Sequence, residues 1–62
     1  LGNVEYLGAI YRLLGEIAVA YPECSLEDPA DYFKKSIAWL RQAGEKQELE
    51  RALNSYAAYK NL

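Results

Sequence analysis

Residues 28–44 constrain the fold most, because they carry a start signal, an apolar stripe and a stop signal for one helix. The side chain of Asp28 is of a type that caps the free amides of a first helical turn, and Pro29 suits the first helical position because it has no amide to leave unpaired. Apolar residues then recur at three- and four-residue steps, at Ala30, Phe33, Ile37 and Leu40. Gly44 is suited to a left-handed cap. We therefore expect a helix over residues 29–43.

The apolar pattern of residues 4–20 predicts an earlier helix. One face carries Val4, Leu7, Ile10, Leu14 and Ile17, and a second band adds Tyr11, Leu13 and Ala18. We expect the first face to pack inside the monomer. Gly8 and Gly15 project from nearly the same side, and glycine costs about 1 kcal/mol relative to alanine within a helix. The pair indicates the close approach of a neighbouring helix; the alternative is that one glycine is simply tolerated.

A third helix is expected over residues 45–60, with acidic residues in its first turn and Lys60 in its last. Its predicted buried stripe consists of Leu49, Ala52, Leu53, Tyr56 and Ala57. Pro22 ends the first helix and opens a connection over residues 21–27, in which Ser25 offers an alternative cap one turn early. Because the connections are short, neighbouring helices should be antiparallel. The predicted fold is all-α, with three antiparallel helices in one segment spanning residues 1–62.

Composition limits the kind of site that this chain can hold. It has 62 residues, no histidine, one cysteine and a net charge of −2, with both signs interspersed. We expect no nucleic-acid partner, no membrane span, no metal and no cofactor, and a cytoplasmic location. Cys24 is interpreted as an ordinary loop or core thiol. So small a chain buries about 60% of the surface that its unfolded form exposes, and its sequence offers no disulfide or metal site to stabilise it. It also contains no methionine, and we expect it to be a fragment of a longer protein.

The order helix, turn, helix, turn, helix resembles the tetratricopeptide repeat (TPR). The residues that match its first helix are Tyr11, Leu14, Gly15 and Ala18, and those that match its second are Phe33, Ser36 and Ile37. Leu53, Tyr56, Ala57 and Lys60 fall at the first-helix spacing again. The resemblance implies one repeat followed by the first helix of the next.

The sequence motifs more closely resemble those of a narrower group: the divergent repeats near the C-terminus of large bacterial signalling proteins with ATPase, nucleotide cyclase or protein kinase domains. The counterparts here are residues 11–16, 30–37 and 48–53. The resemblance implies a non-catalytic scaffold that binds a protein partner or neighbouring repeats.

Three residues are candidates for that protein contact: Trp39, Leu13 and Tyr11. Trp39 lies about 100° from the stripe of its own helix. For Tyr11 the alternative role is in the core. An enzyme using carboxylates such as Glu16, Glu23 and Asp28 is a remote alternative. A further alternative is a self-associating helical bundle, because three helices offer little cover for the apolar first helix. We expect the isolated fragment to form a homo-oligomer, most simply a homodimer built on that helix.

Overall fold

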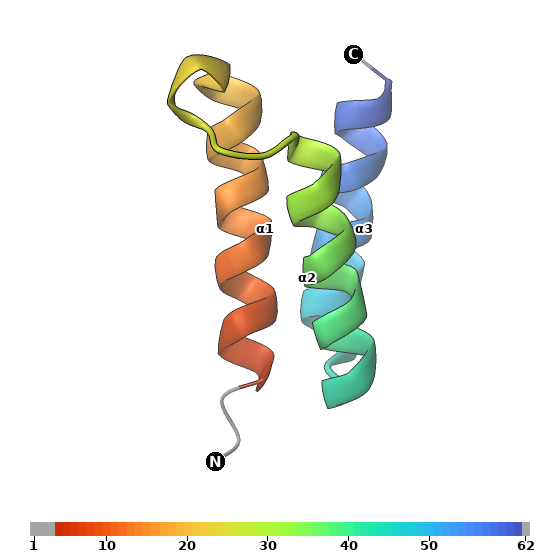
Figure 1. The fold of residues 1–62 in the computed structure, drawn as a ribbon. Helices are drawn as coiled ribbons and strands as arrows, with labels where there is room; N and C mark the ends of the chain where they lie inside the picture. Colours follow the sequence, from red (N-terminus) through yellow and green to blue (C-terminus); the bar gives the residue numbers. More distant parts are fainter. Residues whose placement is uncertain (1–3, 62) are drawn as a thin grey trace.

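The structure, a computed structural model, describes residues 4–61 and contains three α-helices. They are α1 (Val4–Ala20), α2 (Pro29–Ala43) and α3 (Lys46–Lys60), with a short 3-10 helix, η1 (Pro22–Cys24), after α1. Figure 1 shows α1 and α3 running in one direction and α2 in the other. The all-α fold and the helix boundaries are confirmed, except that α3 begins one residue later than predicted. Among residues 4–61, no helix has the length and apolar character needed to cross a membrane.

The ends of α2 follow from local chemistry, with one correction. Pro29 takes the first helical position, but the Asp28 side chain makes no capping hydrogen bond. The main-chain carbonyl of Asp28 already accepts the amide of Asp31 at 3.0 Å, so this amide is not left for the side chain. At the other end Gly44 is left-handed with φ 74°, as expected, and its amide donates to the carbonyl of Arg41. Ser25 does not start α2 one turn early. Its hydroxyl donates to the carbonyl of Glu27, and α2 begins at Pro29.

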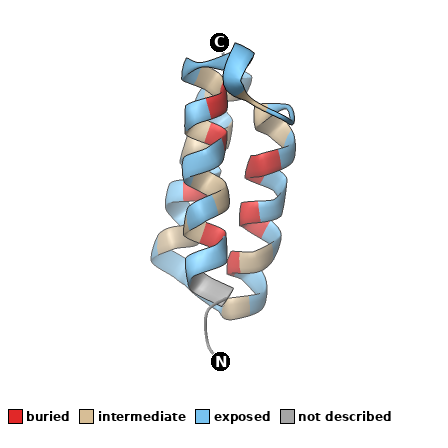
Figure 2. Cartoon of the chain, turned by 60° about the vertical axis from the view of Figure 1, so that its left-hand side comes forward, coloured by how far each residue is buried: buried red, intermediate tan, exposed pale blue. Residues whose placement is uncertain are grey.

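The core lies along α2, which packs against both of the other helices. Phe33, Ile37 and Leu40 are buried as predicted, whereas Ala30 is only half-buried. Two further residues of α2, Tyr32 and Ser36, are also buried. Figure 2 shows the buried positions on the sides of the helices that face one another. The Ser36 hydroxyl donates to the carbonyl of Gly8 at 2.6 Å, which ties α2 to α1 inside the core.

The face of α1 that packs inside is not the one predicted. Its buried residues are Gly8, Gly15 and Ala18, whereas Leu7, Ile10, Leu14 and Ile17 are between 36% and 52% exposed. The side chain of Val4 lies outside the described part of the structure. The glycines do mark a close approach: a Cβ on Gly15 would lie 2.7 to 2.9 Å from ring atoms of Phe33, and one on Gly8 would overlap Leu40. Large α2 side chains fill the space beside the glycines, so the large residues of α1 face outward.

Helix α3 covers the other flank of α2. Ala52 is fully buried against Ile37 and Leu40, and Leu49 and Tyr56 are half-buried beside it. The ring centroid of Phe33 lies 5.9 Å from that of Tyr56 and 6.1 Å from that of Tyr59. Two residues of the predicted stripe, Leu53 and Ala57, are exposed instead. They lie on the side of α3 that faces neither α1 nor α2.

Candidate functional site

The most distinctive surface of the molecule is an apolar face on α1, here called the outer face. It consists of seven large side chains that are between 36% and 63% exposed, six of them in α1 and the last directly after it: Tyr6, Leu7, Ile10, Leu13, Leu14, Ile17 and Tyr21. At about 100° per residue the six α1 positions fall within an arc of roughly 120°. No acidic or basic residue of α1 has its register position in this arc. The outer face is therefore broad, apolar and uncharged.

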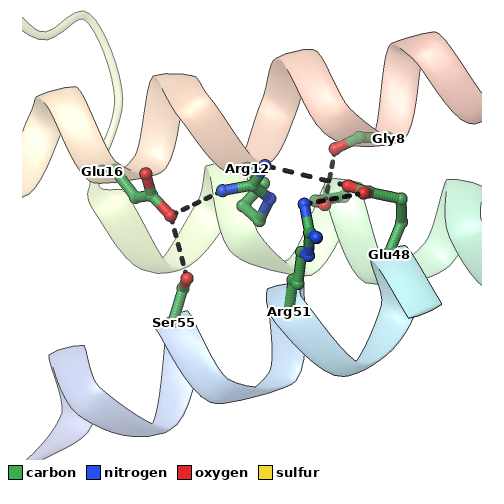
Figure 3. Close-up of polar contacts among 7 residues, drawn as sticks. Gly8, Arg12, Glu16, Glu48, Arg51 and Ser55 are labelled. Carbon is green, nitrogen blue, oxygen red and sulfur yellow. Dashed lines mark hydrogen bonds and ion pairs between the residues drawn. The ribbon is translucent and has the colours of Figure 1, made fainter.

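Two charged residues of α1, Arg12 and Glu16, contact α3 instead, in a polar seam (Figure 3). Arg12 Nη1 lies 2.8 Å from a carboxylate oxygen of Glu16, and that same oxygen accepts the Ser55 hydroxyl at 2.9 Å. Arg12 Nη2 lies 3.7 Å from Oε1 of Glu48, whose other oxygen is 3.3 Å from Arg51 Nη1. Within residues 4–61, the buried Nε of Arg12 and Oε1 of Glu48 have no hydrogen-bond partner. The seam holds α3 beside α1 in parallel orientation.

The carboxylates considered for acid and base chemistry do not line one pocket. Glu16 lines a hollow of about 260 Å³ with Phe33 and Tyr59. Asp28 lines a separate hollow of about 460 Å³ at the turn between α1 and α2. Glu23 lies in η1 and lines neither of these hollows. In the part of the chain that the structure describes, no three His, Cys, Asp or Glu residues are grouped so as to hold a metal ion. Cys24 is an exposed free thiol in η1.

The three predicted contact residues lie in different places. Leu13 belongs to the outer face and is 48% exposed. Tyr11 is half-buried, and the Lys35 amine of α2 lies 5.7 Å from its ring centroid, an approach suited to a cation–π contact. Trp39 is half-buried on α2. In helical register the directions of Tyr11 and Leu13 are about 160° apart, so these two cannot belong to one contact surface.

The rest of the outer face was not predicted from the sequence, although a signal for it was present. Gly8 and Gly15 were correctly interpreted as a point of close approach, and that approach requires the glycine side of α1 to turn inward. The large aliphatic residues occupy the other side of the same helix. The two observations together would have placed Ile10 and Ile17 on the surface.

The turn between α1 and α2 is held by an ion pair. Lys35 Nζ donates to both carboxylate oxygens of Glu27, at 3.0 and 3.1 Å. This hydrogen bond raises the pKa of Lys35 above its usual value of 10.5, because it favours the charged amine, and the charges of Glu27, Tyr11 and Asp31 act in the same direction. The spacing of Asp31 and Lys35, one helical turn apart, would also suit an ion pair, but the salt bridge of Lys35 is with Glu27.

Comparison of the sequence with protein-family models gave no match, and neither curated proteins nor solved structures gave one. The resemblance to tetratricopeptide repeats remains a prediction that rests on the residues quoted for it.

Proposed function

We propose that this chain is a non-catalytic protein-interaction module whose contact surface is the outer face of α1. The observation that carries the proposal is the exposure of seven large apolar side chains, without a charge among them, on α1 and the residue that follows it. With about 200 Å² for each whole side chain, their exposed fractions amount to roughly 700 Å². Contiguous apolar patches on monomers seldom exceed a few hundred Å², and larger ones mark sites of association.

The resemblance to tetratricopeptide repeats suggests a setting for this surface. In that setting the chain is a repeat segment of a large bacterial signalling protein in the cytoplasm, and it binds a protein partner or neighbouring repeats. The arrangement of α1, α2 and α3, in which one helix packs on both its neighbours, is compatible with a stack of helical repeats.

Thiol labelling tests the proposal without requiring the partner to be known. In a Cys24→Ser background, Ile10→Cys places a thiol in the outer face, and Gln42→Cys places a control thiol on the exposed side of α2. We expect Ile10→Cys to react rapidly with a maleimide in the purified 62-residue chain, at a concentration low enough for the chain to be monomeric, and much more slowly in native cells. Gln42→Cys should react at similar rates in both settings. Equal reactivity of the Ile10→Cys thiol in the two settings would show that nothing covers this face, and would refute the proposal.

A second candidate function is self-association through the same face. Its specific support is the absence of charge, because a two-fold interface pairs one patch with its own copy and a charge near the axis would meet a like charge. An isologous pair of outer faces would bury no acidic or basic side chain of α1.

A further inference from the structure

Helices α1 and α3 are equivalent elements, related by a shift of 42 positions. Helix α1 begins at Val4 and α3 at Lys46. The apolar positions coincide under this shift, in the pairs Leu7 and Leu49, Ile10 and Ala52, Leu14 and Tyr56, and Ile17 and Tyr59. The second member of each pair lies in α3 and is buried or half-buried against α2 or beside it. The first member lies in the outer face of α1 and is exposed.

The burial of the two helices is reciprocal on their other faces as well. The α1 residues that face α2 are Gly8, Tyr11, Gly15 and Ala18, all buried or half-buried. Their counterparts in α3 are Glu50, Leu53, Ala57 and Lys60, all exposed. Each helix therefore has two contact faces. Helix α2 packs on α1 at the positions of Gly8 and Gly15, and on α3 at the positions that correspond to the outer face of α1. The contact that α3 makes with α2 has no counterpart at α1 within the described chain.

From this equivalence we infer that the outer face of α1 receives a helix of the α2 type, lying antiparallel to α1. The inference rests on the proposed function and names the partner of the same surface. In it Leu7, Ile10 and Leu14 take the places that Leu49, Ala52 and Tyr56 hold against α2. The total side-chain size is similar, because Ile10 is larger than Ala52 whereas Leu14 and Ile17 are smaller than Tyr56 and Tyr59. Swaps that keep total volume are those that cores tolerate best.

The width of the outer face indicates that a second helix accompanies the first. Helix α3 contacts α2 through one arc and α1 through another, where Glu48 and Ser55 lie in the polar seam. The counterparts of Glu48 and Ser55 are Tyr6 and Leu13, which are 63% and 48% exposed. A helix that packs against two neighbours needs an apolar arc wider than the stripe that suits a single partner. The arc of roughly 120° is explained by a partner that is an antiparallel pair of helices resembling α1 and α2.

Charge and area agree with this partner. The α2 residues that pack near Ala52 and Tyr56 are Phe33, Ile37 and Leu40, none of which is charged, so an α2-like surface matches the uncharged outer face. If the seven exposed side chains are covered and the partner contributes an equal area, about 1,400 Å² is buried in total, within the usual range of about 1,200 to 2,000 Å² for specific interfaces.

A doubled chain tests the inference directly. Residues 3–44 are placed ahead of residues 3–62, so that Val4 of the second copy falls where Lys46 follows α2 in the single chain. We expect one cooperative thermal transition, with a midpoint about 10 °C or more above that of the 62-residue chain, because an added interface stabilises neighbouring repeats. With Ile17→Asp in the first copy, which blocks association through the face left open, the midpoint should not depend on protein concentration. A second version with Ile10→Ala in the second copy restores the residue found in α3, in case Ile10 is too large there.

A charge placed in either copy provides the matched control. Ile17→Asp in the second copy should abolish the gain, whereas Ile17→Asp in the first copy, where the outer face stays open, should keep it. If neither version of the doubled chain gains stability, or if the gain disappears on dilution because a second copy covers the face, the inference is overturned. Slow maleimide labelling of Ile10→Cys in native cells would support the proposed function. If the doubled chain in the same study had no higher thermal midpoint, the inference would be overturned and the proposed function would stand. A fast thiol in cells would refute the proposed function itself.

Discussion

At the scale of single residues, the two glycines of α1 decide which side of that helix turns inward. Gly15 lies against the ring of Phe33, and Gly8 lies against Leu40 while its carbonyl accepts the Ser36 hydroxyl. A methyl group at either position would have to displace a fully buried side chain. The small residues therefore set the spacing of α1 and α2, and α2 supplies the bulk that fills the interface.

Gly15→Ala should destabilise the chain even though alanine is the better helix former. The gain of about 1 kcal/mol in helix propensity is set against an overpacking cost of about 1 to 3 kcal/mol, because the ring of Phe33 must move. We expect a net loss of about 1 kcal/mol in urea denaturation followed by circular dichroism. Asn54→Ala, at an exposed position of α3, is the control and should stabilise by a few tenths of a kcal/mol. A Gly15→Ala variant as stable as the wild type would mean that the space beside Phe33 is larger than described.

Phe33→Ala should remove the central anchor of the core. The Phe33 side chain is 1% exposed and contacts α1 at Gly15 and α3 at Tyr56 and Tyr59. Its truncation should cost about 3 to 5 kcal/mol, a large part of the stability of so small a domain. Circular dichroism should then show a chain largely unfolded at room temperature. A cooperative melt close to that of the wild type would show that the three helices hold together without this ring.

At the scale of the helices, the sequence predicted the helix ends to within one residue and the buried face of α2, but not the face that α1 buries. The ends depend on local chemistry at Pro22, Pro29 and Gly44, and all three act within one turn of their own position. The buried face depends on which helices lie alongside. Helix α1 is apolar on both sides, so its amphipathic pattern alone could not distinguish Leu7 and Ile10 from Tyr11 and Ala18.

In helix α3, two residues that were predicted to be buried are exposed. Leu53 and Ala57 were predicted to be buried because they are apolar and match first-helix positions of a repeat. Their equivalents Tyr11 and Gly15 do pack near α2, but α3 has no described helix on the corresponding side. The candidate site was missed for the same reason, since only Leu13 of the outer face was named as a contact residue.

The polar seam between α1 and α3 gives a prediction at this scale. Arg12→Ala should weaken the attachment of α3, because it leaves the partly buried carboxylates of Glu16 and Glu48 without their shared cation. The expected loss is about 1 to 3 kcal/mol, and amide hydrogen exchange should rise more in α3 than in α2. Arg51→Ala is the matched control: its side chain is 67% exposed, and the loss should stay below about 1 kcal/mol. Equal losses in the two variants would show that Arg12 contributes only as a surface charge.

At the scale of the whole molecule, the outer face makes the behaviour of the isolated chain depend on concentration. With roughly 700 Å² of apolar surface open on one helix, we expect a homodimer that dissociates on dilution, seen by sedimentation velocity. Leu13→Asp should shift the equilibrium to monomer without loss of helix, because Leu13 is half-exposed and lies outside the core. Gln42→Asp, on the exposed side of α2, should leave it unchanged. Fully helical wild-type monomers at every concentration tested would contradict this prediction.

The position of α2 between its two sequence neighbours also bears on how fast the chain reaches this structure. The largest interfaces join α1 to α2 and α2 to α3, and only Gly44 and Glu45 separate the second pair. Native contacts are therefore formed mainly between segments that are close along the chain, so little loop-closure entropy has to be lost before they form. Helical proteins with such local contacts fold in microseconds to milliseconds. Each helix can thus dock almost as soon as the next one has left the ribosome.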